Sequence, residues 1–272
     1  MQTQLWILES LRPDDAKTGR RLRDAVLDRD PLSKNGIRVH FRAPENRKEF
    51  LSCLEEIFVA ANEGGYPVLH IEAHGGEDCL QLSNDEIIKW DELSVPMVKI
   101  NDRLKGNLLV TVAACSGAHM AQTVLSSMRA PFLALVGPGT TLLDSELLKD
   151  YTEFYFEFDK TRSLTKARWA LNAFRTAENN YYCSTARDSF VQIYGSRMSL
   201  NLSVEEQNRR IEELVTRLTS SDSTCDTDTA RAAASKIIGD PKEFVRRAWE
   251  QFVFIDRYPE NVELFPFPFD EQ

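Results

Sequence analysis

The sequence predicts an α/β fold in which a mostly parallel central sheet is covered by helices on both faces. Short apolar or β-branched runs alternate with segments whose apolar residues recur at helical spacing, through about residue 180. This order is typical of right-handed βαβ units. Several runs are apolar almost throughout, as expected for strands buried on both faces. The chain has 272 residues, 42% of them hydrophobic, which is enough to bury a substantial core.

The beginning of the chain contains two predicted strand–helix units. Leu5–Glu9 is a short apolar strand, and the helix after it can be capped by Asp14 or Asp15. Gly36–Phe41 alternates β-branched residues and is the next strand. Asn46 then caps a helix with an apolar stripe along one face. The stripe consists of Phe50, Leu51, Leu54, Ile57 and Phe58.

Three buried strands are predicted next, at Pro67–Ala73, Leu108–Ala114 and Ala130–Gly137. The first two run into clusters of small residues, and the third runs into a turn that contains glycine and proline. Helical pattern returns over residues 144–158 and again over residues 164–178. The strand–helix alternation therefore extends through this part of the chain.

The character of the sequence changes after about residue 195. Charged and Ala-rich helical segments replace the alternation, and the polar loop Ser220–Thr229 interrupts them. We therefore expect an α/β domain of residues 1–200 and a helical C-terminal extension of residues 201–272.

Charge and cysteine usage restrict the class of protein. The formal net charge of -9 gives no electrostatic reason for binding to nucleic acid or to an anionic membrane. The start of the chain lacks the pattern of a secretory signal, and no apolar run approaches the ~20 residues that span a bilayer. Five cysteines without paired spacing argue against a disulfide framework or a zinc site. We expect a cytoplasmic protein without a cofactor or metal.

His74 and Cys115 each follow a predicted strand, where the apolar run gives way to small residues. In an open parallel sheet, catalytic groups gather at the carboxyl ends of the strands, so neighbouring strands would bring both side chains to one edge. A free cysteine has a pKa near ~8.5, which falls at a helix N-terminus or beside an imidazolium. His74 can take the thiol proton and return it to a leaving amine, so the pair suits nucleophilic catalysis. The sequence names no third, acidic member.

Small residues beside the pair are candidate backbone donors. Gly75 and Gly76 leave room for a substrate backbone, and their amides can face a developing oxyanion. Cys115 precedes a predicted helix, so the amides of Ser116 and Gly117 are expected to be unpaired at its N-terminus. These features favour a reactive cysteine over an inert buried one.

The segments around the two residues resemble the signatures of the caspase-like cysteine peptidases of clan CD. One hydrophobic block precedes the His-Gly of HIEAHGG, and a second precedes the Ala-Cys of LLVTVAACSGA. The later segments FLALVGPGTTLLDSELL, EFYFEF and SLTKARWALNAF follow the order seen in the CHAT branch, which is similar to separase. The turn GPGTTLLD departs from that branch, because it lacks the usual Trp before its Asp. The resemblance covers roughly residues 1–180.

The resemblance implies a cysteine endopeptidase that cuts a protein substrate at limited sites, with His74 and Cys115 as its dyad. It also implies an activating or regulatory protein partner, since CHAT-type peptidases of bacteria often accompany antiviral defence or cell-death systems. In separase-like relatives an acidic residue holds a basic P1 side chain, which makes Asp144 or Glu146 a candidate for a specificity pocket. N-capping of the following helix is the simpler role for Asp144.

Other interpretations compete with this one. The same fold can serve as a non-catalytic scaffold or interaction module with an idle dyad. A nucleotide-binding or receiver-like domain would need a Gly-rich phosphate loop after the first strand, and LWILESLRPDD has none. His70 and His74 share a strand face with Glu72 between them, but no further metal ligand lies at a suggestive spacing. His119 and Cys79 lie near the pair in sequence, and we expect packing roles for both.

Overall fold

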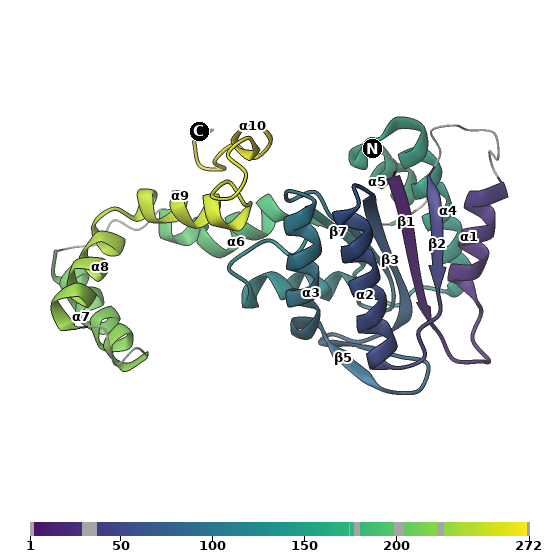
Figure 1. Ribbon diagram of the computed structural model, residues 1–272, viewed down its shortest axis with the longest axis horizontal. Helices are drawn as coiled ribbons and strands as arrows, with labels where there is room; N and C mark the ends of the chain where they lie inside the picture. Colours follow the sequence, from purple (N-terminus) through teal and green to yellow (C-terminus); the bar gives the residue numbers. More distant parts are fainter. Residues whose placement is uncertain are drawn as a thin grey trace. The chain divides into compact units, whose positions relative to one another are not determined.

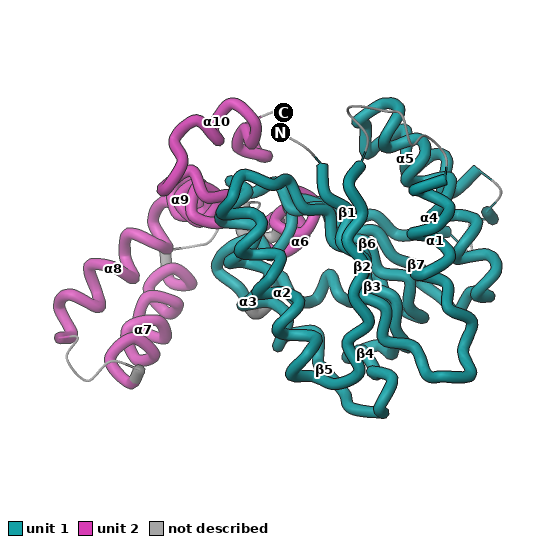
Figure 2. Tube along the Cα trace, turned by 45° about the vertical axis from the view of Figure 1, so that its right-hand side comes forward, with its two compact units in different colours: residues 1–186 teal, residues 187–272 magenta. Residues whose placement is uncertain are grey.

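The computed structural model describes residues 3–28, 37–173, 175–176, 180–198, 204–221 and 226–270. The chain divides into two compact units, residues 1–186 and 187–272, which Figure 2 distinguishes by colour. The division falls at the start of helix α6 (Ala186–Met198), and not at residue 200, where the change in composition suggested it.

The N-terminal unit contains the sheet. In the described residues eight strands form one sheet, whose main path runs β2-β1-β3-β6-β7-β8. Figure 1 labels β2, β1, β3 and β7 of this path. On this path β2, β1, β3, β6 and β7 are parallel to one another, and β8 at the end is antiparallel to β7. Their bounds, in that order, are Arg38–Arg42, Thr3–Ser10, Tyr66–Gly75, Leu109–Ala113, Ala134–Pro138 and Tyr181–Thr185. The expected α/β class with a mostly parallel sheet is confirmed.

Helices cover both faces of this sheet, as Figure 2 shows. On one face α2 packs against α3, which packs against the 3-10 helix η1, and on the other face α4 packs against α1 and α5. Their bounds are α1 Thr18–Asp28, α2 Arg47–Asn62, α3 Trp90–Arg103, η1 Gly117–Ser126, α4 Asp144–Thr161 and α5 Leu164–Asn172. The double cover explains why every residue of β6 is buried and why the strand reads as one apolar run.

The pattern of the sequence located the main strands but missed the hairpin that extends β3. β4 (Cys79–Gln81) pairs antiparallel with the end of β3, and β5 (Ile87–Lys89) pairs with β4. Strands this short carry too few residues for a period of two to be recognised. The last of the expected parallel strands begins only at Ala134, and the antiparallel β8 was not expected.

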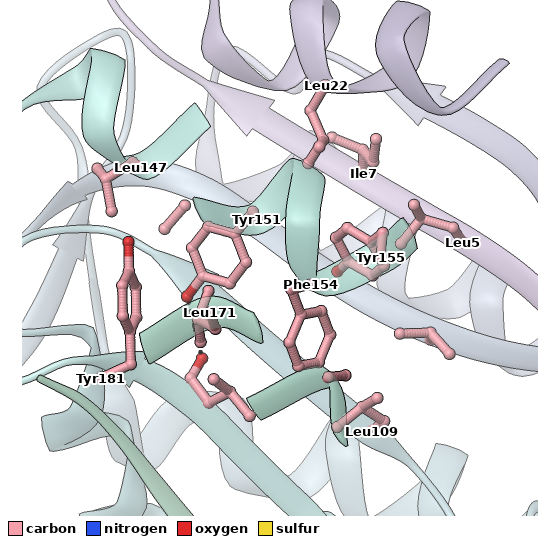
Figure 3. Packing of buried hydrophobic residues seen from close by; sticks show 14 of the residues in the cluster. Leu5, Ile7, Leu22, Leu109, Leu147, Tyr151, Phe154, Tyr155, Leu171 and Tyr181 are labelled. Atoms are coloured by element: carbon pink, nitrogen blue, oxygen red, sulfur yellow. Dashed lines mark hydrogen bonds between the residues drawn. The ribbon is translucent and has the colours of Figure 1, made fainter. Parts of the chain in front are cut away.

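Aromatic residues of α4 form the centre of the core on one face of the sheet (Figure 3). Tyr151, Phe154 and Tyr155 are at most 1% exposed, and full burial of a large apolar side chain stabilises a fold by about 1.5–3 kcal/mol. The Tyr151 hydroxyl donates hydrogen bonds to the carbonyls of Val112 at 3.0 Å and Val136 at 3.3 Å. These contacts fix α4 to β6 near its carboxyl end, just before Cys115, and to the middle of β7.

The C-terminal unit is helical. Phe190 in α6 packs on Trp249 and Phe252 of α9, with ring centroids 4.9 and 5.4 Å apart. The Trp249 indole donates to the Phe265 carbonyl at 3.0 Å, which holds the aromatic tail against α9. The bounds of the remaining helices are α7 Val204–Ser221, α8 Thr227–Gly239, α9 Pro241–Phe252 and α10 Asn261–Leu264. Of the helices described in either unit, none is both long and apolar enough to cross a membrane.

Candidate active site

The carboxyl ends of β3 and β6 bring His74 and Cys115 to the same edge of the sheet. The two strands are parallel neighbours, and their paired residues include Val68 with Leu109 and Glu72 with Ala113. The same offset in residue number separates His74 from Cys115, two residues beyond the last pair. Neighbouring strands lie about 4.8 Å apart. The strand register therefore juxtaposes the two residues that the sequence singled out.

A third side chain reaches His74 from the loop between β1 and α1. Nε2 of His74 lies 2.8 Å from Oδ2 of Asp15, and the same oxygen accepts a hydrogen bond from the Arg12 amide at 2.7 Å. The side chains of His74 and Asp15 are 39% and 25% exposed, so both can meet a ligand. Partial burial by itself raises the pKa of Asp15, but the bonds from His74 and Arg12 outweigh it and the net pKa is lowered.

The contact with His74 corrects the role expected for Asp15. Helix α1 begins at Thr18, so neither Asp14 nor Asp15 directly precedes it, and the expectation that one of them caps the helix is wrong. The Asp15 carboxylate is used by His74 and by the turn that starts at Arg12. One signal was available: a carboxylate just after the first strand lies at the same edge of the sheet as His74 if that strand neighbours β3, as β1 does.

A buried polar cluster lies beneath His74 on the same face of β3. His70, Glu72 and His74 alternate along the strand, so their side chains share a face. Nε2 of His70 lies 3.1 Å from Oε1 of Glu72, and its Nδ1 lies 2.7 Å from the Thr111 hydroxyl and 3.1 Å from that of Tyr155. His70 is therefore engaged at both ring nitrogens in the core, whereas His74 is at the surface.

Two buried carboxylates hold the N-terminus of α1. Glu72 accepts a hydrogen bond from the hydroxyl of Thr18, the first residue of the helix, and Glu9 accepts one from the Arg20 amide at 3.0 Å. Glu9 and Glu72 are partners in the β1–β3 register and are 4% and 2% exposed. Burial raises the pKa of Glu9, and the Arg20 amide offsets this only in part. The start of α1 is thus fixed to the sheet. The end of the loop between β1 and α1, residues 11–17, here called the Asp15 loop, is fixed with it.

Cys115 lies in a tight turn between β6 and η1. Ser116 has a φ of 56°, in the left-handed region, and the Gly117 amide donates to the Ala114 carbonyl at 3.0 Å. The segment after the turn is helical, as predicted, and it is a 3-10 helix. The expectation of an unpaired amide at Gly117 is wrong, because the turn itself uses that donor. The turn, more than a helix N-terminus, sets the direction of Cys115, and Ser116 stays a candidate donor.

Two glycines on the neighbouring strands make room for the Cys115 turn. A Cβ atom on Gly75 would lie 2.3 Å from the carbonyl oxygen of Cys115. On the other side, a Cβ atom on Gly137 of β7 would lie 2.9 Å from the amide nitrogen of Ala118. Non-bonded heavy atoms pack at about 3.5–4.0 Å, so neither position has space for a side chain. Gly75 at the end of β3 and Gly137 within β7 are therefore required by the backbone that carries the thiol.

The two glycines after His74 differ as backbone donors. The Gly76 amide donates to the Cys79 carbonyl at 2.9 Å and closes the β3–β4 hairpin. The expectation that this amide can face an oxyanion is therefore wrong. Hydrogen-bonded and non-hydrogen-bonded pairs alternate along an antiparallel ladder, so the pair of Gly75 with Leu80 is of the second kind. The Gly75 amide is thus not committed to β4 and stays a candidate donor.

The β4–β5 hairpin is tied to the segments that carry the site. Nδ1 of His119 in η1 lies 3.2 Å from the carbonyl oxygen of Glu77, at the turn between β3 and β4. The guanidinium of Arg12, in the Asp15 loop, forms an ion pair with Asp85 at 2.6 Å. His119 therefore has a structural contact beside the site, and the hairpin joins the loops that follow β1, β3 and β6.

Asp144 and Glu146 open α4 after the loop that leaves β7, but their contacts differ. Glu146 accepts from the Leu143 amide at 3.0 Å and pairs with Arg175 at 2.9 Å, and these bonds lower its pKa, the amide first. Asp144 is exposed and is the first helical residue; the N-cap is Leu143, so the N-cap role expected for Asp144 is wrong. Of the two candidates for a specificity pocket, Asp144 has the carboxylate that is open to a ligand.

The other described cysteines, Cys53, Cys79 and Cys183, form no disulfide among the described residues, and Cys225 lies outside those residues. Burial raises the pKa of Cys53 to about 11. Burial also raises the pKa of Cys79, followed by its hydrogen bond with Asp78. A raised pKa lowers the thiolate fraction at neutral pH. In the described ranges, no group of three or more His, Cys, Asp and Glu side chains is arranged to hold a metal ion.

The arrangement brings together the parts needed for acyl transfer. A thiol and an imidazole follow neighbouring strands, and a carboxylate binds the far nitrogen of the imidazole. Between the described atoms of His74 and Cys115 there is no hydrogen bond, and catalytic hydrogen bonds are often long until a substrate binds. The edge of the sheet can therefore supply a nucleophile, a base and backbone donors.

No protein-family model matches the chain, and no curated protein matches it in sequence. A function for the chain therefore has to be argued from the residues at this edge of the sheet.

Proposed function

We propose that the chain is a cysteine endopeptidase with a caspase-like fold, similar to the CHAT branch, and that His74 and Cys115 are its catalytic pair. The observation that carries the proposal is the register, since the two residues keep the offset of the paired residues before them. The carboxyl ends of parallel strands are where α/β proteins gather reacting groups. The close approach of Gly75 to the Cys115 carbonyl supports it, because a Cβ atom there would lie 2.3 Å from that oxygen.

In the proposed reaction His74 accepts the thiol proton, and the Cys115 thiolate attacks the scissile carbonyl carbon. The amides of Gly75 and Cys115 donate to the oxyanion of the tetrahedral intermediate, and losing one such donor typically lowers the rate ~100- to 1000-fold. His74 then gives the proton to the leaving amine as the C–N bond breaks and a thioester forms. Water, deprotonated by His74, attacks the thioester and regenerates the thiol and a carboxylate product.

The proposed substrate is a protein that is cut at few sites after a basic residue, which the carboxylate of Asp144 would hold. Glu146 is the weaker choice, because Arg175 already neutralises its charge. Regulation by a protein partner, a cytoplasmic location and a part in bacterial defence or cell death belong to the same proposal. The partner and the part in defence or cell death are supported by the resemblance of the sequence segments alone, and the cytoplasmic location by the five cysteines without paired spacing.

Cysteine-resolved alkylation tests the pair without a substrate or an activator. The folded protein would be treated with limiting iodoacetamide from mildly acidic to mildly basic pH, and the rate at each cysteine mapped by mass spectrometry. We expect Cys115 to react fastest, to stay reactive at least about one pH unit below an ordinary thiol, and to slow in His74→Ala. Cys53 and Cys79 serve as internal standards, since the pKa of each is raised. A Cys115 that titrates like them in both proteins would contradict the proposal.

A non-catalytic scaffold is the alternative, and the lack of a hydrogen bond between the described atoms of His74 and Cys115 favours it. Profiling of new protein N-termini in a cognate lysate treated with wild type or with Cys115→Ala separates the two. New termini that need Cys115 support the peptidase, and the residue before each of them reports the P1 preference. Equal profiles together with an ordinary Cys115 thiol would favour the scaffold.

A further inference from the structure

The Asp15 loop is closed on itself. Oδ2 of Asp15 accepts the Arg12 amide at 2.7 Å, and the Asp15 amide donates to the Arg12 carbonyl at 3.0 Å. The ammonium of Lys17 donates to the carbonyls of Leu11 and Arg12. A side chain on such a closed turn has little conformational freedom left to lose when it binds a partner. The carboxylate of Asp15 is therefore held in place independently of its contact with His74.

The same loop is anchored on both sides of Asp15. Before it, Arg12 forms the ion pair with Asp85 of the β4–β5 turn, and after it Thr18 donates to Glu72. Glu72 precedes His74 by two residues on the same face of β3. The Asp15–His74 contact thus lies between the Arg12–Asp85 ion pair and the Thr18–Glu72 hydrogen bond, which join the loop to β3 and its hairpin. The surrounding structure therefore supports this contact, unlike an isolated pair of surface charges.

The contact determines which nitrogen of His74 is available. An ionised carboxylate only accepts hydrogen bonds, so in the neutral imidazole the proton is on Nε2 and the lone pair is on Nδ1. The carboxylate also stabilises the imidazolium that forms when Nδ1 takes a proton, as an opposite charge does in general. The lowered pKa of Asp15 keeps it ionised throughout the neutral range.

We infer that Asp15 is a positioning residue, which fixes the tautomer and orientation of His74 so that Nδ1 is the base. What this base acts on, the Cys115 thiol, rests on the proposed function; the hold of Asp15 on His74 does not. The inference adds a third, acidic member to the pair, from the loop that follows β1, the strand on the other side of β3. The competing explanation is that Asp15 only closes the turn at Arg12.

Nitrogen-15 NMR of the histidine side chains tests the hold on His74, because the two imidazole nitrogens have different shifts in each tautomer. We expect neutral His74 to carry its proton on Nε2 in wild type and to become a mixture of tautomers in Asp15→Ala. Asp14→Asn is the matched control, since Asp14 is an exposed carboxylate in the same loop, and it should leave the spectrum of His74 unchanged. Wild-type His74 with its proton on Nδ1 would overturn the inference without any variant.

Alkylation of Cys115 in the same samples adds a readout that a mere turn residue would not move. Asp15→Asn keeps an acceptor oxygen but removes the charge, so we expect the pH at which Cys115 becomes reactive to rise by about one unit, toward that of His74→Ala. Asp14→Asn should follow wild type. Circular dichroism shows whether each variant is folded. If Asp15→Ala is not folded, the tautomer of His74 in the wild type decides whether the inference holds.

Two results separate this inference from the proposed function. If Cys115 depends on His74 but neither readout responds to Asp15→Ala and Asp15→Asn, the peptidase proposal stands and the role of Asp15 is overturned. If the tautomer of His74 responds to Asp15→Ala while Cys115 ignores His74, the proposed function is overturned and the hold of Asp15 on His74 is supported.

Discussion

The two sides of the candidate site are held by different means. His74 is fixed by a side chain, since Asp15 binds its ring at 2.8 Å. Cys115 is fixed by backbone, through the left-handed conformation of Ser116 and the close approach of Gly75. A lost side-chain hydrogen bond typically costs about 0.5–1.5 kcal/mol and the ring can still find water. A backbone clash has no such escape, so we expect the Cys115 side to be the more sensitive of the two.

The largest effect is expected from Gly75→Ala, which tests the backbone side. Its Cβ atom would lie 2.3 Å from the Cys115 carbonyl oxygen, so the turn must move or the strand must shift. We expect the free energy of unfolding to fall by about 3 kcal/mol or more, as measured by urea denaturation, with loss of the enhanced alkylation of Cys115.

Gly76→Ala is the matched control for this prediction. Its Cβ atom would meet only the Cys79 sulfur, at the ordinary contact distance of 3.6 Å. We expect the free energy of unfolding to change by less than about 1 kcal/mol and Cys115 to react as in wild type. Equal losses in Gly75→Ala and Gly76→Ala would mean that the loss of glycine flexibility, and not the lack of room, is responsible.

A smaller effect is expected from Thr18→Val, which breaks the side-chain support on the His74 side. The substitution keeps the shape of Thr18 but removes the hydroxyl that donates to buried Glu72. Leaving a buried acceptor without its donor costs about 1–3 kcal/mol in the free energy of unfolding, measurable by thermal or urea denaturation. Thr152→Val is the control, since the hydroxyl of Thr152 donates to the Leu148 carbonyl within α4. Similar stabilities of the two variants would contradict a supporting role for Thr18.

The same support predicts a dependence on pH through Glu9. Burial raises the pKa of Glu9 above its ordinary value of 4.5, so the folded protein holds this proton more tightly than the unfolded chain. The contribution to stability is therefore full below pH 4.5 and is lost as the pH rises through the raised pKa of the folded state. Glu9→Gln removes this decline, whereas Glu55→Gln on the exposed face of α2 keeps it. Parallel curves of unfolding free energy against pH for wild type and Glu9→Gln would contradict the prediction.

The sequence predicted the strands of the site well, because strands buried on both faces are apolar almost throughout. The runs that became β3 and β6 end within one or two residues of where they were expected, and so His74 and Cys115 were found. The three-residue strands β4 and β5 lie below the length at which alternation is visible. The helix after Cys115 was predicted without its type, since apolar spacing hardly distinguishes a 3-10 helix such as η1 from an α-helix.

The contacts that His74 and Cys115 make with other residues could not be predicted from the sequence. Asp15 can bind His74 because β1 pairs directly with β3, on the side opposite to β6. Strand order of this kind is a property of the assembled sheet. The Gly76 amide is used by a hairpin that the pattern did not reveal. Glu146 was a candidate for binding a ligand until its contacts with Leu143 and Arg175 became visible. Residue types at strand ends are thus readable from sequence, whereas which of them remain free is decided by tertiary contacts.

The smallest effect is expected from Ser116→Gly, and it sharpens the account of the backbone side. A left-handed conformation costs a non-glycine residue roughly 1 kcal/mol, while glycine gives the unfolded chain more freedom, so the net gain in the free energy of unfolding should stay below about 1 kcal/mol. Lys105→Gly is the matched control, because Lys105 has a φ of 54° in a turn after α3. We expect calorimetry to show similar small gains for both variants.

Alkylation then distinguishes two ways in which the turn can be held. If Gly75 and Gly137 confine it by packing, Ser116→Gly should change the rate at Cys115 by no more than about twofold, because the surrounding backbone still permits one path. A much larger fall, with no change in Lys105→Gly, would show that the restricted conformation of Ser116 itself directs the thiol. The Cys115 side would then depend on the single residue Ser116, as the His74 side depends on Asp15. The two sides would still differ in one respect, since Ser116 acts through its backbone and Asp15 through its side chain.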